Sequence, residues 1–87
     1  MKKEHFEYIT EHFNLSQYSP ENNAASIWRE EREGDMNVSD LEVMAISNNR
    51  YHIHTKKHRN SLFCYIPSRE LAMEIIEHIK DTEILFL

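Results

Sequence analysis

Two histidines separated by one residue are the side chains of this sequence best suited to chemistry. His52 and His54 lie in segment 51–55, whose β-branched and aromatic residues predict a strand. Alternate residues of a strand share a face, so the two imidazoles could bind one metal ion, with Cys64 as a third candidate ligand. The spacing matches no specific zinc signature, and a half-exposed strand gives the same pattern without a metal. We therefore predict no metal and no cofactor.

Nucleophilic and acid/base catalysis are poorly supported by the remaining residues. Cys64 lies between Phe63 and Tyr65 in an apolar run, which favours a small core residue over an exposed thiolate. The acidic run 30–35 alternates between faces if it is extended, and nothing indicates a pocket beside it. A single glycine, Gly34, excludes a glycine-rich phosphate-binding loop. The prediction is that the protein is not an enzyme.

A basic island interrupts an acidic chain. The 87 residues carry a net charge of −5, yet segment 43–68 contains Arg50, Lys56, Lys57 and Arg59 and no acidic residue. A basic hairpin of this kind can contact a nucleic-acid backbone. Four cations are few for such binding, and charge runs usually form solvated surface.

Hydrophobic periodicity predicts two helices. Apolar residues recur at helical spacing over residues 3–13, and a wider apolar stripe runs along the helix expected after Ser68, which can cap its first turn. Strands are expected at 24–33, 41–46, 51–55 and 62–66, and the apolar segment 84–87 predicts a last short strand or a packed extension.

The pair Asn48-Asn49 predicts a two-residue hairpin turn between the central strands. That turn pairs position 46 with 51 and position 44 with 53, which puts Ile46, Tyr51, Met44 and Ile53 on the core side. Pairing Lys56 with Leu62 adds Phe63 and Tyr65 to that side and sets Cys64 opposite His54. The other side, the "mixed face", then consists of Leu41, Val43, Ala45, His52, His54, Lys56, Leu62, Cys64 and Ile66.

These patterns predict one α+β domain over residues 1–87. It has a small antiparallel sheet of three to five strands with an N-terminal and a C-terminal helix, in the order α-β-β-β-β-α. A single cysteine, a charged N-terminus and the lack of a long apolar run predict a soluble, cytoplasmic protein with no membrane segment.

The leading functional hypothesis is a small non-enzymatic protein-binding domain, a regulator or inhibitor that acts through the mixed face and its adjoining charges. An apolar centre bordered by polar groups is typical of interfaces. The partner would be another protein or a second copy of this chain. The alternatives are a nucleic-acid binder that uses hairpin 50–59, and a metal protein or enzyme that uses His52 and His54. The predicted binding residues are Leu41, Val43, His52, His54, Lys56, Leu62 and Ile66.

Overall fold

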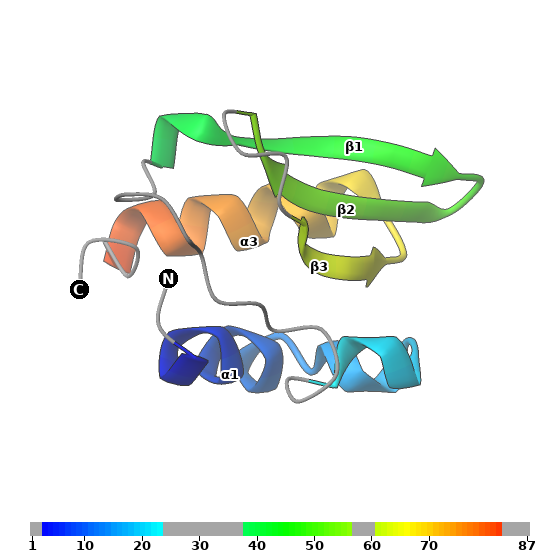
Figure 1. Cartoon of the computed structure of the whole chain (residues 1–87), viewed down its shortest axis with the longest axis horizontal. Helices are drawn as coiled ribbons and strands as arrows, with labels where there is room; N and C mark the ends of the chain where they lie inside the picture. The colour runs from blue at the N-terminus through cyan, green and yellow to red at the C-terminus, as the bar shows by residue number, and fades with distance from the viewer. Residues whose placement is uncertain (1–2, 24–37, 57–60, 83–87) are drawn as a thin grey trace.

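The computed structural model describes residues 3–23, 38–56 and 61–82. Within these ranges, two α-helices and three strands form the framework (Figure 1). The elements in chain order are α1 (Lys3–His12), the 3-10 helices Leu15–Gln17, Pro20–Asn22 and Val38–Asp40, β1 (Leu41–Ser47), β2 (Arg50–Thr55), β3 (Ser61–Ile66) and α3 (Arg69–Thr82).

The strands form an antiparallel sheet in the order β1-β2-β3. The turn between β1 and β2 is the predicted Asn48-Asn49 pair, and Asn49 has φ 58°, a left-handed conformation that asparagine tolerates well. The α+β class and the antiparallel sheet are thus confirmed, with three strands in the described part. The strands predicted at 24–33 and 84–87 lie outside the described residues.

Helix α3 begins where the sequence predicts. The Ser68 hydroxyl oxygen accepts a hydrogen bond from the Leu71 amide at 3.1 Å, which satisfies one of the unpaired donors of the first turn. Ala72, Ile75 and Ile79 then recur on one side of the helix and are fully buried. This stripe packs across the sheet (Figure 1).

Helix α1 covers the core next to β3. The buried Phe6 stacks on Phe63 of β3, with ring centroids 4.8 Å apart. At the end of α1, the His12 ring stacks on His78 of α3 at 4.5 Å, so the two helices also contact each other. The core is therefore built between one face of the sheet and both helices. No described helix has the length and apolarity that a membrane crossing requires.

The register of the β1–β2 hairpin differs from the prediction by one residue. Val43 pairs with Ile53, and Met44 pairs with His52, whereas Ser47 pairs with Arg50 next to the turn. Ile46 is therefore an extra residue on β1, a β-bulge that changes the pairing beyond it. The prediction that Met44 and Ile46 lie in the core is wrong: they are 46% and 48% exposed.

The third strand is also shifted relative to the prediction. Phe63 pairs with Ile53 and Ser61 pairs with His54, with irregularities on either side of Ile53. Phe63 is fully buried, as predicted. The expected position of Cys64 opposite His54 is wrong, because Ser61 occupies it.

These shifts divide the predicted mixed face between the two sides of the sheet. Leu41, Val43 and Ala45 pair with Thr55, Ile53 and Tyr51 on the helix-covered side, the "inner face", which Ile66 joins opposite Tyr51. Leu41, Leu62 and Ile66 are buried in the core, and Val43 packs against it. The opposite "outer face" carries Glu42, Met44, His52 and His54.

Candidate functional site

A polar row crosses the outer face from β1 to β2. Glu42 pairs with His54 in the register, and its Oε1 lies 2.6 Å from His54 Nε2. This is a close electrostatic contact, although its direction is not that of a good N–H···O hydrogen bond. Lys56 Nζ lies 3.9 Å from the other oxygen of Glu42. The row thus brings an acid, an imidazole and an ammonium group together and leaves little unbalanced charge.

His52 continues the row toward β3. Its ring stacks on His54 with centroids 5.1 Å apart, and its Nδ1 lies 3.1 Å from the Ser61 hydroxyl oxygen. Nε2 of His52 is buried and has no hydrogen-bond partner. Burial lowers the pKa of His52, and the neighbouring His54 lowers it further. Both effects favour the neutral form of the His52 ring.

The described residues around His52 and His54 supply neither a third metal ligand nor the acid of a relay through His52. Among the residues described, no three His, Cys, Asp or Glu side chains are grouped to hold a metal ion. A Ser–His–acid relay needs an acid on the second nitrogen of the histidine ring. Ser61 contacts one nitrogen of His52, but the other has no partner.

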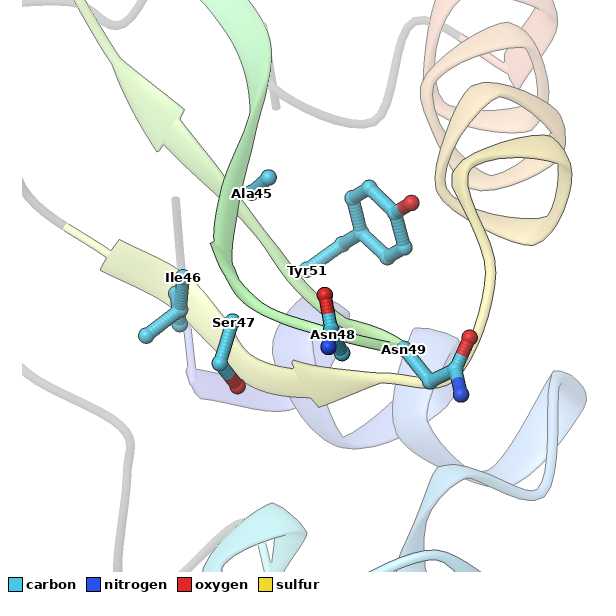
Figure 2. Close-up of a pocket in the computed structure, with 6 residues that line it drawn as sticks. All are labelled: Ala45, Ile46, Ser47, Asn48, Asn49 and Tyr51. Atoms are coloured by element: carbon cyan, nitrogen blue, oxygen red, sulfur yellow. The ribbon is translucent and has the colours of Figure 1, made fainter.

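Exposed apolar side chains adjoin the polar row at the end of β1. Residues 44–47 are all exposed, and we call them the "hairpin patch". Figure 2 shows Ala45 and Tyr51 pointing to the same side of the hairpin and Ile46 pointing away from them. An open hollow at the hairpin tip includes part of this patch. It is lined by Ala45, Ile46, Ser47, Asn48, Asn49 and Tyr51 (Figure 2).

In the described part of the chain, no strand lies along the outer edge of β1, and this edge is open there. Within residues 3–23, 38–56 and 61–82, β2 is the only strand that pairs with β1. An unpaired edge presents a row of backbone N–H and C=O groups that can pair with another chain. Proline and lysine, which commonly block such edges, are absent from Leu41–Ser47. The bulge at Ile46 is the protective feature that β1 does have.

The edge of β3 is capped at Tyr65 by a side chain. The amide oxygen of Asn22 accepts a hydrogen bond from the Tyr65 backbone N–H at 3.0 Å, and the amide nitrogen donates to the Tyr65 carbonyl. The same nitrogen donates to the Leu15 carbonyl at 3.0 Å. Asn22 thus satisfies Tyr65 much as a neighbouring strand would. The two edges of the sheet are therefore not equivalent.

The predicted nucleic-acid residues are not brought together in the described part of the chain. Arg50 is the first residue of β2, and Lys56 follows its last residue at the opposite end. The Arg50 guanidinium lies 5.5 Å from the centroid of the Tyr65 ring, and Lys56 lies near Glu42. Lys57 and Arg59 lie outside the described residues. A phosphate-binding cluster at this hairpin stays a prediction.

Sequence reasoning found part of this surface. It placed His52 and His54 side by side, and the structure does so. It missed Glu42 and Ser61 as their neighbours, and it assigned Met44 to the core. The pairing register was the missing information for Glu42 and Met44, which lie on a strand that the sequence had located. Ser61 was expected in the turn before the third strand, whereas the structure makes it the first residue of β3.

Comparison with known proteins gives this chain no relative: no family model, no curated protein and no solved structure matches it.

Proposed function

We propose that this protein is a small non-enzymatic protein-binding domain that accepts an extended segment of another protein along the edge of β1. The observation that carries this proposal is an open seven-residue edge on which Met44 and Ile46 are about half exposed. Most of the other large apolar side chains that the structure describes are buried or half-buried. Apolar groups left at an open edge are typical of binding surfaces.

In strand addition, both the backbone and the side chains of β1 would contact the partner. A partner segment would form main-chain hydrogen bonds with β1, and its alternate side chains would contact those of the sheet. Met44 and Ile46 are two positions apart, so they match the repeat of an extended segment. The hollow at the hairpin tip would receive a side chain at the end of that segment.

The charges of β1 also indicate the chemistry of the partner. Glu42 is the only charged residue of the strand, and His54 and Lys56 already lie close to its carboxylate. The edge therefore has no strong field that would select a highly charged peptide. We expect an extended segment with apolar residues at alternate positions and no proline at the positions that donate hydrogen bonds to β1. By binding such a segment of its partner, the protein would act as a regulator or inhibitor.

A selection from a random peptide library tests the proposal. The selected peptides are measured against the parent and against two variants, Met44→Lys and Met73→Lys. Met73 is a matched control because it lies on α3 and is 45% exposed, close to the 46% of Met44. We expect Met44→Lys to weaken binding about tenfold or more, because a lysine on an edge strand opposes pairing.

Met73→Lys should leave peptide binding unchanged, and circular dichroism should show that both variants fold like the parent. Peptides that bind Met44→Lys as tightly as the parent would refute the proposal. A library that yields no binding peptide would refute it as well.

A further inference from the structure

We infer that the edge of β1 also pairs with β1 of a second copy of this chain, antiparallel, so that two three-stranded sheets join into one of six strands. The inference rests on the proposed function, because it names an occupant of the same edge. Its evidence is the order of residues along β1 and the difference between the two edges of the sheet.

The single charge of β1 favours antiparallel pairing of two copies. Pairing centred on Ala45 places Glu42 of one copy opposite Asn48 of the other. The two Glu42 residues then lie about 20 Å apart along the strands, at about 3.3 Å per residue. Parallel pairing would instead place the acids side by side, where like charges destabilise a sheet.

The exposed apolar side chains complement each other in the same register. Met44 of each copy lies opposite Ile46 of the other, so that two Met–Ile pairs form across the symmetry axis. Directly opposed side chains share a face of the sheet and contact each other. Each copy would thus cover the two apolar side chains that β1 leaves exposed in the single chain.

The cap that Asn22 places on β3 at Tyr65 disfavours a second pairing there and limits the assembly to a pair. A chain with two open edges would add copies without end, whereas a chain with one open edge forms a closed twofold dimer. Asn22 occupies the backbone groups of Tyr65 on β3, so the dimer has β3 strands at its outer edges. The joined sheet therefore stops at six strands.

The dimer should be weak enough for a partner to displace it. A stable interface buries about 800 Å² on each side, and one short strand supplies less than that. The second copy and the peptide of a partner would compete for the same edge. Self-pairing would then protect the exposed edge until the partner is present.

Sedimentation velocity over a range of about 10 µM to about 1 mM tests the self-pairing, since an edge interface of this size is expected to dissociate within it. The parent should shift from monomer to dimer and form nothing larger. Met44→Lys should raise the dissociation constant about tenfold or more, because it opposes both Met–Ile pairs. Met73→Lys should behave like the parent.

Cysteine cross-linking tests the register. In a Cys64→Ala background that folds normally by circular dichroism, Ala45→Cys should form a disulfide dimer, because residues at the axis have Cα atoms about 5 Å apart. Ser47→Cys is the control, since its two copies would lie about 13 Å apart along the strands. Cross-linking of Ser47→Cys that equals that of Ala45→Cys would overturn the register.

A parent protein that stays monomeric up to about 1 mM would overturn the self-pairing, since even a weak edge interface should associate by then. That result would not affect the proposed function, because peptide binding to β1 is measured separately on the monomer. A protein that dimerises but binds no peptide would refute the proposed function and leave the self-pairing standing. The two failures are therefore distinguishable.

Discussion

Replacing Asn22 with aspartate should strongly destabilise the fold. Asn22 is fully buried, and its amide nitrogen donates to the carbonyls of Leu15 and Tyr65. Aspartate keeps the acceptor for the Tyr65 N–H but loses both donated bonds. Each carbonyl that loses its partner in a buried site costs about 1–3 kcal/mol, and a buried carboxylate beside two carbonyl oxygens costs more. We expect Asn22→Asp to lower the free energy of unfolding by about 3–5 kcal/mol.

Gln17→Glu is the matched control for this change. It also converts an amide to a carboxylate and adds the same charge, but Gln17 is exposed in the neighbouring 3-10 helix. Urea unfolding followed by circular dichroism at pH 7 gives both free energies. A loss within about 1 kcal/mol of the Gln17→Glu value would show that Asn22 does not hold the edge of β3 as described.

Three further changes test the core and the outer face. Ile75→Asp places an unpaired carboxylate at a fully buried position of α3 and should unfold the domain by circular dichroism; melting like the parent would refute the core assignment. Val43→Glu should lower the free energy of unfolding by about 1–3 kcal/mol, because Val43 packs against the core on the inner face; an unchanged melting temperature would contradict that placement. The pKa of His52 is lowered in the fold, so the unfolded chain binds a proton more readily than the folded one. The contribution of neutral His52 to the free energy of unfolding is therefore present above about pH 6.5 and is lost as the pH falls through the lowered pKa. The melting temperature of the parent should therefore fall more between pH 7.5 and about pH 5 than that of His52→Gln, and equal falls would contradict the desolvation of His52.

The sequence predicted features that depend on neighbouring residues. The stripe of α3 and its Ser68 cap are such features, because a helix is formed by interactions three or four residues apart. The turn at Asn48-Asn49 was also located correctly, and the pairing of Ser47 with Arg50 beside it has the predicted offset. The prediction failed one residue farther along β1, at the bulge.

A bulge has no reliable signal in a single sequence, and one extra residue moves every later side chain of its strand to the other face. Glu42 was the residue in the sequence that could have indicated the shift. The predicted register puts Glu42 on the core side with Met44, whereas the bulge at Ile46 moves it to the outer face beside His54. A charged residue on the predicted core face should have argued for a shifted register.

The cap of Asn22 on Tyr65 could not be predicted from the sequence for a different reason. Asn22 lies in a segment that reads as a polar turn, and Tyr65 is 43 residues farther along the chain. Local patterns carry no information about such a distant contact. The same holds for the separation of His54 from Cys64, which depends on the irregular pairing of β3.

The measurement that tests the central claim most directly is an amide chemical-shift map of the protein titrated with a peptide chosen by the library selection. We expect the largest shifts on residues 42–47 and on their β2 partners, because a strand added to β1 changes the hydrogen bonds of its outer edge. The experiment is carried out on dilute protein, so that self-pairing does not contribute. Largest shifts on α1 or around the exposed Tyr18, with residues 42–47 unchanged, would contradict the claim that β1 is the binding surface.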